Sequence, residues 1–335
     1  MALNSSGPIS LAGTTTGQSI AVELSLGATT QISLNDTAVR TLAGVPSGAI
    51  TMPTNFYGKS SGFSGAISTN QTNLNLRTWA LANGWNGTTP ATITVNSGVY
   101  VWSNAIATAA MTINGAWPGG VTLVNNGYIM GQGGQGEGFS GSAVSTVGGP
   151  AISLGINTTI INNSYIGGGG GGGGKGAYAG GGGGAGGGVG GCGAVASVLG
   201  GTGGAIGASG TTSSSGNNTG GGGGRVFPGS GGAGGNNCSA PSYGCGKGGT
   251  AGGGGGAANV SYGNGVGGAG GSAGSAGASA VLTGGCYGAG GGGGWGASGG
   301  SGILSSNPMA GGKAIALNGF TATRSGSGAT YGAVA

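Results

Sequence analysis

Short stretches in which apolar and polar residues alternate occupy much of the chain between residues 90 and 130. Such alternation is typical of strands with one buried face. It predicts strands at Ala91–Val95, Val99–Trp102, Met111–Asn114 and Val121–Val124. Leu74–Asn83 instead has the spacing of one short helix, which Gly84 would end. We therefore predict a small all-β module that carries a single helix.

The first 60 residues are predicted to form a separate unit. Ile9–Leu11 and Ile20–Leu24 alternate like short strands. Thr37–Ala43 is predicted to be a helix, because it follows helix-capping residues and Gly44 comes directly after it. Residues 61–72 are polar and rich in Gly, Ser, Thr and Asn, a composition that predicts a linker.

A pattern of strand, glycine-rich excursion and strand occurs twice. Val121–Ile129 resembles Thr158–Ile166 at an offset of 37 residues, and each runs into glycine. The two exits, 148–155 and 311–319, also resemble each other. Repeats of this kind usually reuse one supersecondary unit. We expect paired strands to anchor both ends of each excursion, with the β module at 61–166 completed by 313–335 and a glycine-rich domain at 167–312.

Glycine dominates the second excursion, and the chain has 97 glycines in 335 residues. The longest blocks are Gly167–Gly174, Gly180–Gly184, Gly220–Gly224, Gly252–Gly256 and Gly290–Gly294. Collagen is excluded because no strict Gly-X-Y period exists and there are only 9 prolines. A flexible linker and a bundle of polyproline-II-like glycine helices remain as alternatives. In such a bundle, neighbouring helices would supply partners for every backbone N–H and C=O group.

The segments between the glycine blocks favour the ordered bundle, because they contain apolar and aromatic residues that a linker does not need. The return of the chain to the same β module points the same way. The predicted fold class is therefore mostly β with one short helix and little α-helix otherwise, plus a polyglycine-II helical sandwich.

Composition argues against catalysis. The chain has no histidine, and its 3 carboxylates, Glu23, Asp36 and Glu137, are far apart in the sequence. Acid–base catalysis, nucleophilic triads and metal sites draw on these residue types, so we expect no enzyme activity, no metal and no cofactor. The 8 cations are scattered, which argues against a nucleic-acid groove although the net charge is +5.

All 4 cysteines fall in the glycine-rich region. They allow three pairings. One of these joins Cys238 to Cys245 and Cys192 to Cys286, and unpaired buried cysteines are the alternative. Disulfides would imply an oxidising final environment. The N-terminus lacks the features of a secretion signal, and no stretch has the length of a membrane span. A virus particle released by lysis would reconcile these features.

The first 60 residues resemble the N-terminal segment of many phage tail-tip and tail-fibre proteins. The resemblance rests on Gly7–Leu11, Gln31–Asn35, Val45–Ile50 and Phe56–Ser60. It implies docking to other tail or baseplate proteins of the virion.

The glycine-rich excursion resembles the polyglycine-helix adhesins at the tips of T-even-type long tail fibres, because it has the same alternation of glycine blocks and side-chain-rich insertions. In that family the glycine helices are scaffold, and the connecting loops bind an outer-membrane protein. The chain departs from the pattern in one respect. Those adhesins attach to a separate fibre tip, whereas this chain has its own docking segment, which leaves its position and its copy number, monomer or homotrimer, open.

The resemblance implies a receptor-binding protein located in the virion, at the tail tip or fibre, with a bacterial outer-membrane protein or surface glycan as partner. Loops between glycine segments suit this role because a rigid scaffold positions them. The candidate loops are 195–199, 211–219, 225–228, 236–245, 259–264 and 303–309. The candidate contact residues are Val195, Leu199, Asn217, Arg225, Phe227, Tyr243, Tyr262, Asn264 and Leu304. For the aromatic residues, packing over the edge of the glycine core is the alternative. A purely structural tail protein is the rival function, and an ice-binding glycine-helix protein is disfavoured by the irregular insertions.

Overall fold

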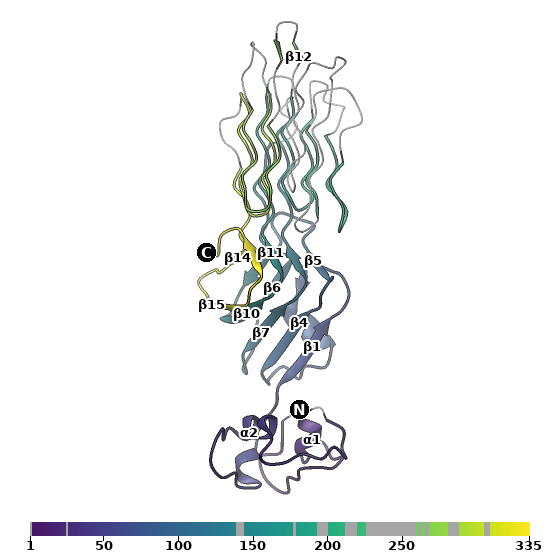
Figure 1. Cartoon of the computed structure of the whole chain (residues 1–335), viewed down its shortest axis with the longest axis vertical. Coiled ribbons are helices and arrows are strands. Elements are labelled where there is room, and N and C mark those ends of the chain that lie inside the picture. The colour runs from purple at the N-terminus through teal and green to yellow at the C-terminus, as the bar shows by residue number, and fades with distance from the viewer. Residues whose placement is uncertain are drawn as a thin grey trace. The chain divides into compact units, whose positions relative to one another are not determined.

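The structure, a computed structural model, is mostly β (Figure 1). It describes residues 2–24, 26–138, 144–176, 179–192, 200–211, 220–225, 259–260, 263–264, 268–280, 288–304 and 309–335. The described part contains short α-helices at α1 (Ile20–Glu23), α2 (Thr37–Ala43) and α3 (Leu76–Ala82). The predicted mostly-β class is therefore confirmed, with more helix in the first 60 residues than the single helix of the β module.

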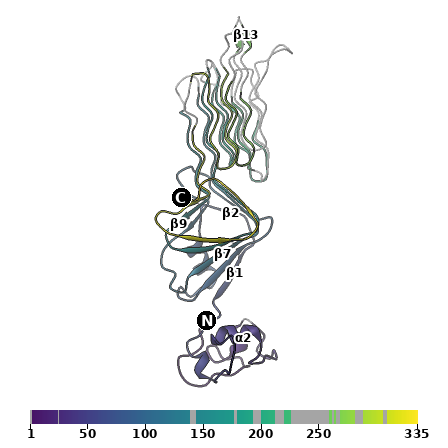
Figure 2. The same ribbon diagram turned by 60° about the vertical axis from the view of Figure 1, so that its left-hand side comes forward.

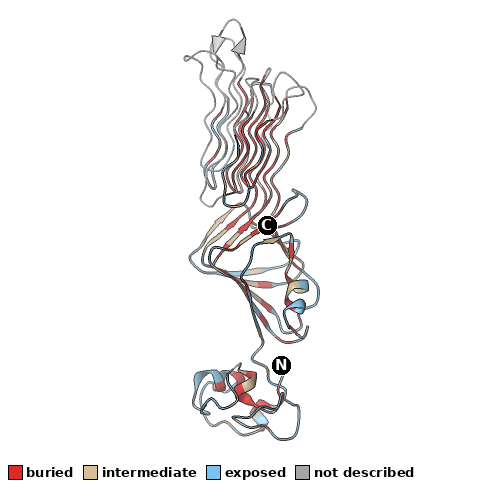
Figure 3. Cartoon of the chain, turned by 90° about the vertical axis from the view of Figure 1, so that its right-hand side faces the viewer, coloured by how far each residue is buried: buried red, intermediate tan, exposed pale blue. Residues whose placement is uncertain are grey.

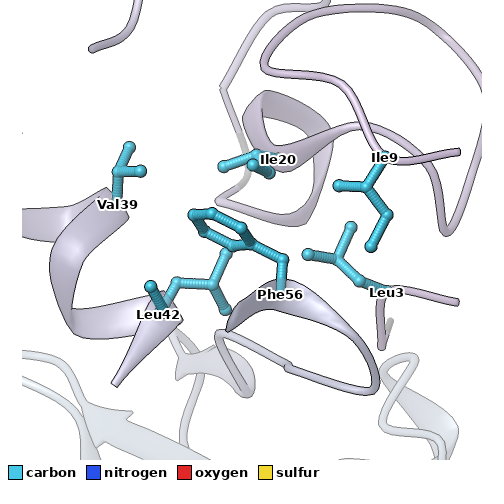
Figure 4. Close-up of a cluster of buried hydrophobic side chains, with 7 residues drawn as sticks. Leu3, Ile9, Ile20, Val39, Leu42 and Phe56 are labelled. Atoms are coloured by element: carbon cyan, nitrogen blue, oxygen red, sulfur yellow. The ribbon is translucent and has the colours of Figure 1, made fainter. Parts of the chain in front are cut away.

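The N-terminal residues form a small lobe with a side-chain core. Phe56, from the 3-10 helix η1 (Thr54–Phe56), is fully buried against Ile20 of α1 and Leu42 of α2 (Figure 4). The predicted helix at 37–43 is confirmed, and Gly44 ends it at φ +72°. The strand predicted at Ile20–Leu24 is wrong, because Ser19 caps a helical turn there by accepting a hydrogen bond from the Val22 amide. A run this short has too few residues for its period to distinguish helix from strand.

The next part of the chain is a parallel β-helix. Successive coils stack into a five-stranded sheet in the order β1-β4-β7-β10-β15, a second in the order β2-β5-β8-β11-β16, and a four-stranded sheet in the order β3-β6-β9-β14. The first sheet consists of Phe63–Ile67, Ala91–Val95, Val121–Asn125, Thr158–Asn162 and Ala322–Ser325. The second consists of Gln71–Thr72, Tyr100–Trp102, Tyr128–Met130, Tyr165–Gly167 and Ala329–Tyr331. The third consists of Leu74–Asn75, Met111–Ile113, Ile152–Leu154 and Ile315–Ala316.

The repeat in the sequence corresponds to neighbouring coils. Tyr165 lies opposite Tyr128 in the parallel pair β11–β8, and Ile315 lies opposite Ile152 in β14–β9. The first glycine-rich excursion therefore leaves from β8 and returns to β9, and the second leaves from β11 and returns to β14. Paired strands hold both ends of each excursion, as the 37-residue offset predicts.

Two local predictions in this region need correction. The linker predicted at 61–72 contains strands β1 and β2, so that prediction is wrong. Gly65 weakens the strand pattern in the sequence. Glycine is needed at this position because a Cβ would lie 2.8 Å from the Phe63 ring and 2.9 Å from the Trp79 ring. The helix predicted at 74–83 begins at Leu76, because Leu74 and Asn75 form β3.

The chain divides into two compact units, one of residues 1–66, 77–94 and 115–124 and one of 67–76, 95–114 and 125–335. The second unit includes the glycine-rich segments, which run side by side in both views (Figures 1 and 2). Figure 3 shows that most of their described glycines are buried. A short antiparallel hairpin, β12 (Asn259–Val260) and β13 (Gly263–Asn264), also belongs to this unit.

Candidate functional site

The amide groups of Gly169–Gly174 donate hydrogen bonds with a period of three residues. Gly169 and Gly172 donate to the carbonyls of Gly149 and Thr146, at 2.9 and 3.0 Å. The next pair, Gly170 and Gly173, donates to Ala185 and Gly182, and the third pair, Gly171 and Gly174, donates to Ala297 and Gly300. One segment therefore bonds to three different neighbours. A repeat of about three residues is that of a polyproline-II-type helix.

The carbonyl groups of the same segment accept bonds from further neighbours. The amides of Gly131, Gly134 and Glu137 donate to Gly167, Gly170 and Gly173, again at every third residue. Gly293 and Gly290 donate to the carbonyls of Gly171 and Gly174. The segment is thus bonded on several sides through its backbone alone. We call this assembly of segments, with the first excursion 131–149 included, the glycine bundle.

A second segment repeats the pattern. The amides of Gly181 and Gly184 donate to Glu137 and Gly134, those of Gly182 and Ala185 to Gly290 and Gly293, and those of Gly183 and Gly186 to Gly221 and Gly224. In each pair the donor number rises by three while the acceptor number changes by three. The period is therefore a property of the bundle and not of one segment.

Close approach of the backbones explains why these positions are glycine. A Cβ built on Gly170 would lie 2.1 Å from the Gly293 carbonyl oxygen, and one on Gly172 would lie 1.7 Å from that of Gln135. On Gly223 it would lie 1.8 Å from the Gly184 oxygen. No side chain fits at such distances unless the neighbouring segment moves. The requirement for glycine here comes from packing, since the φ angles of these residues are not positive.

The turns at one end of the bundle rest on an aromatic cluster of the β-helix. Trp295 is fully buried with Met130 and Ala185, and Tyr100, Tyr128, Tyr165 and Tyr331 pack against this cluster. The four tyrosine rings stack in sequence, with centroid distances of 4.6, 5.9 and 6.4 Å. Burial, and then repulsion from Tyr128, raises the pKa of Tyr100 above its ordinary value. The aromatic contacts fix where the bundle begins.

Charged side chains in the described part of the bundle make contacts within it. Lys175 Nζ lies 3.0 Å from Glu137 Oε1, and the Lys175 amide donates to Glu137 Oε2 at 3.3 Å. Arg225 donates from Nη2 to Gln132 Oε1 at 2.6 Å and from Nε to the Gly186 carbonyl at 3.1 Å. The Lys175–Glu137 and Arg225–Gln132 contacts join the first excursion to the second, and the Arg225–Gly186 bond lies within the second.

Few of the candidate receptor residues lie within the described part of the chain. Arg225 is half-buried in the contacts above, Leu304 is 53% exposed, and Asn264 lies in β13 opposite Asn259. The other candidates, Val195, Leu199, Asn217, Phe227, Tyr243 and Tyr262, lie outside the described residues. Cys192 is buried, and the disulfide predictions otherwise fall on Cys238, Cys245 and Cys286, which also lie outside.

Sequence reasoning missed Gln132 and the pairing of Glu137 with Lys175. A signal was available in the charges. Only 3% of the residues are charged, so a charged side chain beside a glycine block is surrounded mainly by backbone. Because a buried charge must be paired or hydrogen-bonded, such a side chain is expected to have a specific partner. Nothing local identifies that partner, because Arg225 lies 93 residues from Gln132.

Across the described residues, no group of His, Cys, Asp and Glu side chains could hold a metal ion. No helix of the described chain is long and apolar enough to cross a membrane.

Comparison with known proteins gives a consistent result. No curated protein matches the chain. Among solved structures, one chain of the gp37–gp38 adhesin tip complex of the bacteriophage S16 long tail fibre has a similar fold, with a TM-score of 0.53 and 19% identity. The match covers 97% of this chain and 100% of that one. The family model of the phage tail fibre adhesin Gp38 matches residues 63–242, which include coils of the β-helix and much of the glycine-rich region. Since that range is more than half of the chain, the protein belongs to the Gp38 family of phage tail fibre adhesins.

Proposed function

We propose that this adhesin binds a receptor on the bacterial surface through the insertions between its glycine segments. The observation that carries the proposal is the saturation of the bundle backbone. The amides of Gly169–Gly174 all donate to neighbouring segments, and five of the six carbonyls, all but that of Gly172, also accept bonds. A surface of this kind has few free groups with which to distinguish partners. Discrimination needs shape and apolar anchors, which the insertions contain.

The proposal includes the architecture of the scaffold. We infer that the glycine segments are polyglycine-II helices packed as a sandwich, because their hydrogen bonds recur at every third residue and reach several neighbours. The domain boundaries remain those proposed from the sequence, at 1–60, 61–166 with 313–335, and 167–312. The first excursion, 131–149, is hydrogen-bonded into the bundle and supports adding it to the third domain.

Attachment to the virion is the second part of the proposal. The similar solved structure is a complex of gp37 with gp38 at a long tail fibre tip. By analogy this chain would attach to another tail-fibre protein, and residues 1–60 are the proposed docking lobe. The receptor would be an outer-membrane protein or a surface glycan, and binding rather than catalysis is the expected activity.

A loop exchange tests receptor binding. Residues 226–228, 236–245 and 259–264 are replaced by Gly/Ser/Asn sequences of equal length, with Arg225 retained, and adsorption of the rebuilt virions to host cells is measured. We expect adsorption to be lost while the protein is still incorporated. Phe320→Ser is the matched control, because Phe320 is an exposed aromatic residue of the β-helix part, at 37% exposure, and its loss should leave adsorption unchanged.

The alternative is a purely structural tail protein with the same fold. Normal adsorption of the loop-exchange virions, with normal incorporation, would favour this alternative and contradict the receptor-binding proposal.

A further inference from the structure

Arg225 ends the segment 220–225 and is the first residue of the candidate loop 225–228. Its backbone is fixed on both sides. The Arg225 amide donates to the Ala208 carbonyl at 2.9 Å, and its carbonyl accepts from the Gly207 amide at 3.1 Å. The turn at 206–208 therefore holds the Arg225 backbone in place.

The side chain is fixed as well. Its guanidinium lies on the turn at Gly186 and Gly187, so closely that a Cβ on Gly187 would be 2.5 Å from Arg225 Nε. Nε donates to the Gly186 carbonyl, and Nη2 donates to Gln132 Oε1. Gln132 in turn donates from Nε2 to the Gly187 carbonyl at 3.1 Å. These contacts link the first excursion, the turn at 185–187 and the end of the segment 220–225.

A cationic side chain that contacts the receptor must expose its charge to solvent. The Arg225 guanidinium is instead partly desolvated, and burial lowers its pKa from the ordinary value. Its hydrogen-bonding fork is directed at acceptors within the bundle. Planar fork geometry is the property in which arginine differs from lysine, whereas a displayed charge could be supplied by either residue.

We infer that Arg225 is a positioning residue, which holds the end of the segment 220–225, and with it the start of the candidate loop 225–228, on the turn at 185–187 through its bonds to Gln132 and Gly186. The inference rests on the proposed function, since it assigns Arg225 to the support of the binding insertions and not to direct contact with the receptor. It replaces the direct receptor contact that the sequence predicts for Arg225.

The experiment compares Arg225→Lys, Arg225→Gln, Gln132→Ala and the double variant Arg225→Lys with Gln132→Glu. Lys313→Gln, at an exposed position, is the control that removes one charge elsewhere. Two quantities are measured for each variant: hydrogen exchange of the Gly186 and Arg225 amides in the purified protein, and adsorption of rebuilt virions at several salt concentrations.

For a positioning residue, Arg225→Lys and Gln132→Ala should both speed exchange at these amides and weaken adsorption, each by about tenfold, since each weakens a charge-assisted hydrogen bond. The salt dependence of adsorption should stay that of the wild type. The double variant should recover part of both, because a lysine can pair with a carboxylate at position 132. Lys313→Gln should change neither.

A direct receptor contact gives the opposite pattern. Arg225→Lys and Gln132→Ala would then exchange and adsorb like the wild type, and only Arg225→Gln would lose adsorption together with part of its salt dependence. That result overturns the inference. A second result also overturns the inference: Arg225→Lys and Gln132→Ala show faster hydrogen exchange but adsorb normally, while the virions with replaced loops have lost adsorption. If the loop-exchange virions adsorb normally, the proposed function has failed instead, and the exchange data alone still decide whether Arg225 anchors the chain.

Discussion

The β-helix and the glycine bundle both have a buried interior, but side chains fill the interior of the β-helix whereas backbone fills that of the bundle. In the β-helix, buried side chains such as Ile93, Leu123 and Ile160 fill the interior, with at most 1% exposure. In the bundle, the buried material around Gly170 is backbone, and the cohesion comes from hydrogen bonds between segments. Side-chain burial tolerates changes of shape to a degree, whereas a backbone interior tolerates no added atom. The two regions should therefore respond to mutation in opposite ways.

The largest effect is expected from Gly170→Val. The new Cβ would lie 2.1 Å from the Gly293 oxygen, which must move away. That movement disturbs the bonds from Gly170 to Ala185, from Gly134 to Gly170 and from Ala185 to Gly293. Each buried group left without a partner costs about 1–3 kcal/mol. Thermal melting should show a severely destabilised bundle.

The control for this variant is Ala205→Val, which enlarges an exposed side chain on another glycine-rich segment. It should melt close to the wild type. Equal melting temperatures for Gly170→Val and Ala205→Val would contradict a backbone-packed interior.

In the β-helix a removal, not an addition, should be damaging. Leu123→Ala leaves a cavity at a fully buried position and should lower the free energy of unfolding by about 2–5 kcal/mol. Leu123→Met, which keeps the volume, should cost less than about 1.5 kcal/mol. Denaturant unfolding followed by circular dichroism measures both, and a tolerated Leu123→Ala would show that the β-helix does not depend on its side-chain core.

A smaller effect is expected where the β-helix also uses polar groups. Asn162 is buried, donates to the Ala329 carbonyl at 3.0 Å and accepts from Asn125 Nδ2 at 2.8 Å. Asn162→Ala removes one bond from the Asn125 amide group and one from the Ala329 carbonyl, at about 1–3 kcal/mol. Asn163→Ala, one residue away with an exposed bond to Asn126, is the matched control and should be nearly neutral in the same unfolding assay.

The smallest effect is expected from Glu137→Gln in the bundle. The ion pair with Lys175 is partly exposed, with side-chain exposures of 27% for Lys175 and 15% for Glu137. A glutamine keeps an acceptor for the Lys175 amide, so the loss should be at most about 1 kcal/mol and should vanish in high salt. A larger loss that persists in high salt would mean that charge, and not backbone bonding, holds the two excursions together.

The sequence predicts the parts of the fold that repeat locally. The offset between Val121–Ile129 and Thr158–Ile166 correctly indicates neighbouring strands, and Asn125 and Asn162 are indeed bonded. The stacking of all coils into a parallel β-helix is not predicted, because the coil geometry depends on pairings such as Thr158 with Ala322, which lie far apart in the chain.

The candidate site is less predictable than the fold. The glycine blocks indicate a backbone-packed scaffold, but which segments are neighbours cannot be deduced from residues without side chains. The first excursion was assigned to the β module for this reason, although Gly134 bonds to Gly170 and Gly184. The role of Arg225 could not be found either, since its partner Gln132 lies in that other excursion.

Hydrogen exchange across the whole chain tests the central claim most directly, because that claim concerns amides and not side chains. Amides that donate inside the bundle, such as those of Gly170, Gly173 and Gly184, should exchange as slowly as amides of the β-helix core, such as that of Met111, which donates to Ala151 at 2.9 Å. Slow exchange at consecutive glycines of 168–174 is the predicted result. Fast exchange throughout these glycines, with the β-helix still protected, would contradict the account and would make the glycine-rich region a flexible insertion.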